Sequence, residues 1–172
     1  MGTLPLFFSS ELPYMKKIFT TFYLITSILL CQSAGLIGSF FTISQTNTWY
    51  KTLVQPSFVP PSWLFGPVWI ILYTLMGIAL FLLWQSPKNS HRTRALTIFF
   101  IQLALNAAWT PIFFGLHAIG AALVFIIFLL IAIAATIWSI YTISRTAGYL
   151  LVPYCVWVLF ATMLNTAFWI LN

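Results

Sequence analysis

The chain has 172 residues, of which 62% are hydrophobic and only 5% are charged. Soluble domains carry charge on roughly a quarter of their residues, so this composition excludes an ordinary water-exposed surface. The formal net charge of +6 raises the question of a nucleic-acid partner. The basic residues flank apolar segments and form no basic stripe, so they indicate membrane orientation instead. The sequence therefore predicts an integral membrane protein with no nucleic-acid partner.

The first predicted membrane span covers residues 18–43, which carry no charge. A spanning helix needs about 20 apolar residues. Lys16 and Lys17 precede this run and resemble the start of a signal peptide, but the run is longer than the usual signal core of roughly 7–15 residues. We therefore expect an uncleaved anchor. Residues 1–17 are expected to form a poorly ordered tail or an interfacial segment, and residues 18–172 to form one transmembrane domain.

Four more spans are predicted along the rest of the chain. Residues 64–85 form the second, and residues 95–144 are uncharged but too long for a single crossing. Pro111, Gly115 and Gly120 supply a break, which gives spans at 95–114 and 118–141, and residues 146–172 form the last. Short connections favour antiparallel neighbours. The predicted fold class is an all-α bundle of five transmembrane helices.

Basic residues are distributed unevenly between the two sides of this bundle. Five crossings leave only Lys51 on the far side, whereas the N-terminal side holds Lys16, Lys17, Lys88, Arg92, Arg94 and Arg145. The positive-inside rule then places the N-terminus in the cytoplasm if the membrane is a bacterial inner membrane. An organelle membrane or an outer membrane is the alternative.

Polar and aromatic residues share helical faces in three of the spans. Gln102, Asn106 and Trp109 recur at spacings of three and four on the third span. Two interpretations stay open: hydrogen bonds between helices, or an Asn106 amide that faces a ligand. Comparable faces on the second and fifth spans carry Trp69 and Tyr73, and Trp157, Ala161 and Leu164. These residues favour either core packing or one shared ligand pocket.

The sequence offers little conventional catalytic apparatus. Glu11 is the only acidic residue, which excludes a carboxylate pair and makes a hydrolase triad implausible. His91 and His117 have no carboxylate or thiolate at ligand spacing, so we expect no metal site. Cys31 and Cys155 lie in apolar runs and are interpreted as small buried hydrophobes. No phosphate-binding glycine loop is present, and no cofactor is expected.

The connection before the second span is unusually apolar and rigid. Residues 55–69 read QPSFVPPSWLFGPVW and contain no charge. Because proline restricts φ and lowers the entropy cost of ordering a loop, this segment predicts a rigid lid over the mouth of the bundle. The candidate lid residues are Pro60, Pro61, Trp63 and Phe65, and Trp69 is expected just inside. A lid over an apolar cavity suits a flat hydrophobic ligand.

Three motifs resemble the TspO/MBR family, which comprises translocator proteins and tryptophan-rich sensory proteins. They are WYKTLVQPSFVPPSWLFGPVWIILYTLMG at 49–77, QLALNAAWTPIFFG at 102–115 and PYCVWVLFATMLN at 153–165. The resemblance covers about residues 18–172. It implies a five-helix bundle, often a homodimer, that binds porphyrins, sterols and synthetic drugs. It also implies a ligand pocket formed by Trp69, Tyr73, Asn106, Trp109, Trp157, Ala161 and Leu164.

The resemblance leaves three functions open. The first is a receptor, sensor or transporter of hydrophobic tetrapyrroles such as porphyrins and haem-pathway intermediates. The second is light-dependent porphyrin degradation, for which the family implicates the positions of Trp69 and Trp157. The third is a membrane scaffold regulated by its ligand. Animal members carry a sterol-recognition pattern near the end of the last helix, where this chain has Thr166 and Ile170, so sterol binding by that route is not expected.

Overall fold

The computed structural model describes residues 7–46 and 48–172, with side chains from Lys17 onward. Its long helices are α1 (Phe7–Gln45), α3 (Ser62–Gln85), α4 (Ser90–Thr110), α5 (Ile119–Tyr141) and α7 (Val152–Leu171). Two short helices, α2 (Trp49–Thr52) and α6 (Arg145–Leu150), lie in connections, and the π-helix η1 (Pro111–Gly115) extends α4. No strand occurs in these described ranges. The predicted all-α class is therefore confirmed.

Five of the described helical segments are long and apolar enough to cross a membrane: Lys17–Gln45, Ser62–Gln85, Ser90–Gly115, Ile119–Tyr141 and Arg145–Leu171. They correspond to the five predicted spans, and the protein is a multi-pass integral membrane protein. The first helix begins at Phe7, earlier than residue 18, so the helix continues into the segment expected to be a tail. The assignment of residues 1–17 as a separate region stays a prediction.

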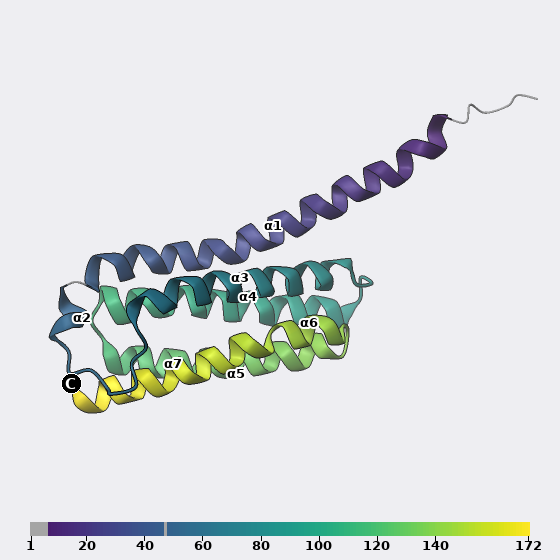
Figure 1. The fold of residues 1–172 in the computed structure, drawn as a ribbon. Coiled ribbons are helices and arrows are strands. Elements are labelled where there is room, and N and C mark those ends of the chain that lie inside the picture. Colours follow the sequence, from purple (N-terminus) through teal and green to yellow (C-terminus); the bar gives the residue numbers. More distant parts are fainter. Residues whose placement is uncertain (1–6, 47) are drawn as a thin grey trace, which may run out of the picture.

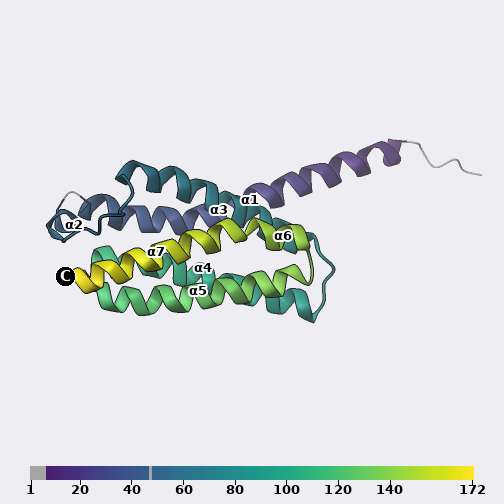
Figure 2. The same ribbon diagram turned by 60° about the horizontal axis from the view of Figure 1, so that its bottom comes forward.

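Successive long helices run in opposite directions and pack into one bundle (Figures 1 and 2). Helix α1 packs against α3 and α4, α5 packs against α4 and α7, and α6 packs against α3. One end of the bundle holds α2 and the end of α7, and we call it the α2 end. The opposite end holds the α3–α4 connection and α6, and we call it the basic end because Lys88, Arg92, Arg94 and Arg145 lie there. The N-terminal part of α1 extends beyond the basic end (Figure 1).

Close approach of α1 and α3 depends on glycine. A Cβ atom added at Gly77 would lie 2.5 Å from Ile28 Cα, a separation that backbone atoms cannot accommodate. Farther along the same contact, a Cβ atom at Gly35 would overlap the Tyr73 ring. Gln32 Nε2 also donates to the Ile70 carbonyl oxygen at 2.9 Å. The two helices are therefore joined along much of their common length, which positions Tyr73 toward the bundle interior.

The predicted break between the third and fourth spans is a π-helical turn. Pro111 has no backbone N–H to donate, and the Leu116 N–H donates to the Pro111 carbonyl oxygen at 2.9 Å, five residues back. His117 then adopts a positive φ of 54°, which reverses the chain direction before α5 begins. The widened turn shifts Phe113 and Phe114 to the inner side of the α2 end, where both line the cavity described next.

Candidate ligand cavity

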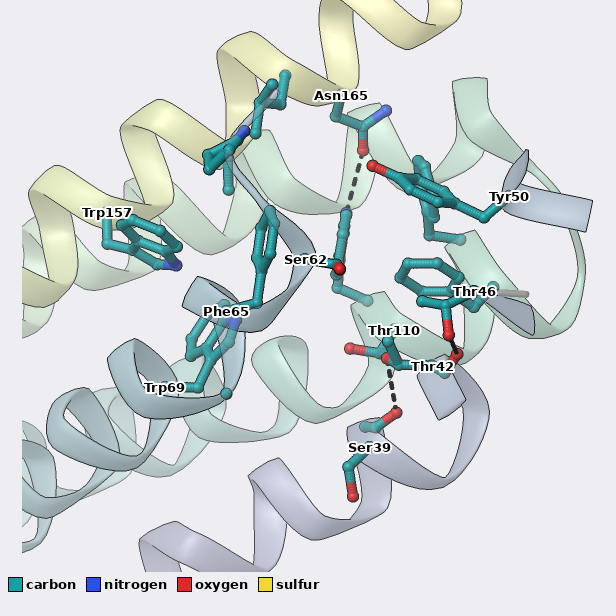
Figure 3. Close-up of a pocket in the computed structure, with 18 of the residues that line it drawn as sticks. Ser39, Thr42, Thr46, Tyr50, Ser62, Phe65, Trp69, Thr110, Trp157 and Asn165 are labelled. Carbon is teal, nitrogen blue, oxygen red and sulfur yellow. Dashed lines mark hydrogen bonds between the residues drawn. The ribbon is translucent and has the colours of Figure 1, made fainter. Parts of the chain in front are cut away.

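A cavity of about 850 Å³ occupies the α2 end of the bundle (Figure 3). Its volume falls within the range of roughly 300–1,000 Å³ that small-molecule sites usually have. Helices α1, α3, α4, α5 and α7 contribute to its walls, together with residues of α2, η1 and the α2–α3 connection. The structure brings together all seven residues of the expected pocket, namely Trp69, Tyr73, Asn106, Trp109, Trp157, Ala161 and Leu164.

Aromatic rings from α3 and α7 form one wall of the cavity. Trp69 stacks on Tyr73 with ring centroids 5.3 Å apart and an interplanar angle of 25°. Phe65 meets Trp157 edge to face at 5.9 Å, and these rings lie near Trp69 in Figure 3. The Trp157 indole N–H is buried and has no hydrogen-bond partner among the described residues. This wall offers flat apolar surfaces and one unused donor.

A chain of buried hydrogen bonds connects α3, α4 and α7 beside the aromatic wall. The Tyr73 hydroxyl donates to Asn106 Oδ1 at 2.5 Å, and Asn106 Nδ2 donates to the Tyr154 hydroxyl at 2.9 Å. The Tyr154 hydroxyl in turn donates to Gln102 Oε1 at 3.0 Å. Asn106 is only 5% exposed. Its amide therefore joins helices, as the packing interpretation predicted, while it also lines the cavity.

A second pair of side chains links α4, α5 and α7. Trp109 Nε1 donates to Asn165 Oδ1 at 3.1 Å, and Asn165 Nδ2 donates to the Ile119 carbonyl oxygen at 3.0 Å. Trp109 also stacks on Phe113 with ring centroids 5.2 Å apart. Because these contacts hold the Trp109 ring from two sides, it presents a fixed face to the cavity.

The wall formed by α1 was missed by the sequence analysis. Gly38, Ser39 and Thr42 line the cavity from one face of this helix, and Thr46 lines it from the turn that follows. Thr42 and Thr46 donate their hydroxyl protons to carbonyl oxygens of α1, so their oxygen atoms remain able to accept. The recurrence of small and hydroxyl residues every three or four positions is the signal that could have found this face.

Tyr154 was also missed, although it contacts the expected pocket residues. It is buried, and its ring meets Trp69 edge to face at 6.4 Å. Tyr154 precedes Trp157, Ala161 and Leu164 at helical spacing on the same face of α7. That periodicity was the available signal, and the pocket implied by the family resemblance did not include Tyr154.

The rim of the cavity contains polar groups and one cation. Lys51 of α2 and Gln55 of the following loop line it, together with Tyr50. Burial raises the pKa of the Tyr50 hydroxyl, so this group stays neutral at physiological pH. No acidic residue is among the described residues that line the cavity. The rim is therefore suited to neutral or anionic ligand groups.

The proline-rich connection contributes to the cavity only in part. Pro60 and Pro61 line the cavity from the connection, and Phe65 lines it from the start of α3. Trp63, a candidate lid residue, does not line the cavity and is 71% exposed. Phe58 contacts Phe160 of α7 at 6.5 Å. The connection is thus packed against α7 at the edge of the cavity.

Histidine and cysteine residues form no cluster at the cavity. Among the residues with described side chains, no group of three or more His, Cys, Asp or Glu could hold a metal ion. His117 stacks on Trp49 with ring centroids 4.2 Å apart, and its Nε2 lies 3.2 Å from Gln45 Oε1. Cys31 and Cys155 are free thiols.

Comparison with known proteins identifies the family. The model of the TspO/MBR family matches residues 27–170. The "Tryptophan-rich protein TspO" of Archaeoglobus fulgidus is 47% identical over 150 residues, which cover 87% of this chain and 96% of the relative. The human "Translocator protein" is 41% identical over 143 residues, which cover 81% and 85% of the two chains. "Protein CrtK" of Rhodobacter capsulatus is 36% identical over 143 residues, covering 83% and 88%. The chain belongs to the TspO/MBR family.

Proposed function

We propose that this protein is a membrane receptor, sensor or transporter-like protein that binds hydrophobic tetrapyrroles in the cavity at the α2 end. One observation carries the proposal: a cavity of about 850 Å³ combines flat rings on one wall with hydroxyl groups and a lysine on the others. Porphyrins are flat, largely apolar and edged by carboxylates. Their rings can therefore pack on the aromatic wall, and their carboxylates can bind the hydroxyl groups and the lysine. The names "Translocator protein" and "Tryptophan-rich sensory protein" among the relatives accord with transport or sensing.

The α2–α3 connection is proposed to act as the lid of this cavity. Pro60 and Pro61 line the cavity, and proline limits the freedom that the loop would lose on closing. The charge distribution supports a membrane orientation in which the basic end faces the cytoplasm, with a bacterial inner membrane as the setting. A homodimer is a further expectation, and Ala104, which is exposed on α4, belongs to a small-residue pair that suits a helix contact.

A titration with protoporphyrin in the dark tests the binding proposal. The protein is purified in detergent, and binding is measured by the shift of the main porphyrin absorption band. Ala161→Trp fills part of the cavity and should abolish saturable binding. Ala134→Trp adds the same side chain at an exposed position of α5 outside the cavity and should bind as the unmodified protein does. Equal binding by both variants would place the porphyrin elsewhere.

Light-dependent porphyrin degradation is a second candidate function. The observation that favours it is that Trp69 and Trp157 both line the cavity, so a porphyrin bound there would lie beside two oxidisable indoles. The reaction requires an oxidant, for which molecular oxygen is the proposed source. Illumination of the bound porphyrin with and without oxygen separates the two functions. If the bound porphyrin stayed intact under light in the presence of oxygen, the degradation function would be rejected and the binding function would remain.

A further inference from the structure

A second cavity, of about 360 Å³, lies at the basic end of the bundle. It is lined by Tyr23 of α1, by Trp84 and Gln85 of α3, and by Lys88 and Arg92 around the start of α4. None of these residues lines the ligand cavity at the α2 end. The two cavities therefore share no lining residue, and the proposed tetrapyrrole site does not include the second one.

The charge of this cavity is not balanced within the protein. Two of its five lining residues are cations, and Glu11 is the only acidic residue of the chain. Glu11 lies twelve residues before Tyr23 on α1, which separates their backbone positions by about 18 Å along the helix. No residue with a described side chain can supply a carboxylate to Lys88 or Arg92. An anion that neutralises this cavity must come from outside the chain.

The Arg92 guanidinium is held in place but incompletely bonded. Its Nη1 donates to the Ser86 carbonyl oxygen at 3.3 Å, whereas its Nε is buried and has no hydrogen-bond partner among the described residues. A buried donor without a partner is costly. Guanidinium groups bind phosphate oxygens through two parallel N–H donors. Arg92 therefore retains donor capacity that a phosphate group can fill.

The remaining lining residues indicate an amphiphilic ligand. Tyr23 meets Trp84 edge to face at 6.4 Å, and Trp84 lies one residue before the end of α3, at the depth where tryptophan and tyrosine mark the membrane–water interface. Tyr23 is 49% exposed, and Ile25 and Leu29, which follow it on α1 toward the middle of the bundle, are 52% and 62% exposed. These apolar side chains offer a path for acyl chains along α1 from the basic end toward the middle of the bundle.

From these observations we propose that the second cavity binds the headgroup of an anionic phospholipid. Lys88 and Arg92 contact the phosphate, the Tyr23–Trp84 pair packs on the glycerol region, and the acyl chains lie against the exposed face of α1. A zwitterionic lipid carries its own cation beside the phosphate and gains less from this site. Bound lipid would join α1 to the α3–α4 connection at the end of the bundle opposite the tetrapyrrole cavity.

Native mass spectrometry of the purified full chain tests the proposal. The protein is titrated in neutral detergent with phosphatidylglycerol and with phosphatidylcholine of the same acyl chains. We expect phosphatidylglycerol to bind more tightly, and Lys88→Gln and Arg92→Gln each to weaken its binding about fivefold. Arg94→Gln removes a cation from an exposed position on the same helix that does not line the cavity and should leave the affinity unchanged. Melting temperatures measured in phosphatidylcholine check that each variant is folded. If Arg92→Gln does not fold, Lys88→Gln still tests the proposal, because Lys88 is exposed.

Three outcomes would overturn the proposal. Equal affinity for the two lipids would remove the charge selectivity. An equal loss in Arg94→Gln and Arg92→Gln would mean that diffuse surface charge attracts the lipid. Glycerol phosphate, which has the headgroup chemistry without acyl chains, is titrated in parallel. If it bound as tightly as the lipid, the site would serve a soluble phosphate compound. Protoporphyrin binding, measured on the same variants, should not change, so failure of this proposal and failure of the tetrapyrrole proposal are distinguishable.

Discussion

The side chain of Asn172 pairs with the backbone of Val54 in both directions. Asn172 Oδ1 accepts from the Val54 N–H at 2.8 Å, and Asn172 Nδ2 donates to the Val54 carbonyl oxygen at 3.1 Å. One amide thus reproduces the pairing that a neighbouring strand would give, and it attaches the α2–α3 connection to the end of α7. If this connection is the lid, the pair is its latch.

Loss of the latch should speed ligand exchange. Asn172→Ala removes both hydrogen bonds, each worth about 1 kcal/mol, so the loop should open more often. We expect protoporphyrin to dissociate about fivefold or more faster in a stopped-flow competition experiment. Asn172→Asp keeps the acceptor for the Val54 N–H and should show a smaller effect. Unchanged dissociation in Asn172→Ala would show that the loop does not control access.

Charge at the rim should select ligands with carboxylates. Among the described residues that line the cavity at the α2 end, Lys51 is the only cation. Lys51→Gln should weaken protoporphyrin binding about threefold to tenfold, because an ion pair at a partly solvated site contributes about 1 kcal/mol. It should leave binding of the uncharged protoporphyrin dimethyl ester unchanged. An equal loss for both ligands would show that Lys51 acts through packing.

Replacement of the two cavity tryptophans tests the photochemical function. Trp69→Phe combined with Trp157→Phe retains aromatic rings at both positions, so the fold and the binding of porphyrin in the dark should persist. Light-driven porphyrin loss should disappear, because phenylalanine is far harder to oxidise than tryptophan. A double Trp49→Phe and Trp138→Phe variant is the control, since neither residue lines the cavity. Continued porphyrin loss in the first variant would remove Trp69 and Trp157 from the mechanism.

The Asn106 amide should matter first for stability. Asn106→Leu leaves the Tyr73 hydroxyl without its acceptor and the Tyr154 hydroxyl without one donor, and each unsatisfied buried group costs about 1–3 kcal/mol. Unfolding in mixed micelles should therefore become easier by roughly 2 kcal/mol. Adding Tyr73→Phe removes one stranded hydroxyl and should recover part of the loss. A stable Asn106→Leu variant with weakened porphyrin binding would instead support a direct ligand contact.

Two glycines of α3 offer a matched test of helix packing. Gly77→Ala would force its Cβ against Ile28 Cα, whereas nothing lies within 4 Å of a Cβ added at Gly66. The first substitution should destabilise the bundle by about 1–3 kcal/mol. The second should be neutral or slightly stabilising, because alanine favours a helix over glycine. Equal melting temperatures for the two variants would contradict the close α1–α3 contact.

The sequence was most informative where residues obey a strong local rule. Uncharged runs located five spans because charge is costly in a bilayer, and the i, i+4 spacing of Gln102 and Asn106 correctly placed both on an inner face. The start of α1 was harder to predict, because its first turns combine charged residues with good helix formers. The basic-end cavity could not be predicted, since it depends on Tyr23 meeting Trp84 across two helices. No local pattern encodes such a contact.

The hydrogen bonds from Tyr73 to Gln102 have one direction. Tyr73 donates to Asn106, Asn106 to Tyr154 and Tyr154 to Gln102, which lies one helical turn nearer the basic end and whose Nε2 has no partner among the described residues. If a ligand oxygen accepted the hydrogen bond from the Tyr73 hydroxyl, Asn106 Oδ1 would lose its donor. The side chains of Asn106, Tyr154 and Gln102 would then have to change hydrogen-bond partners together. Ligand binding in the cavity would then change the direction of hydrogen bonds on three helices, and none of the helices would have to move.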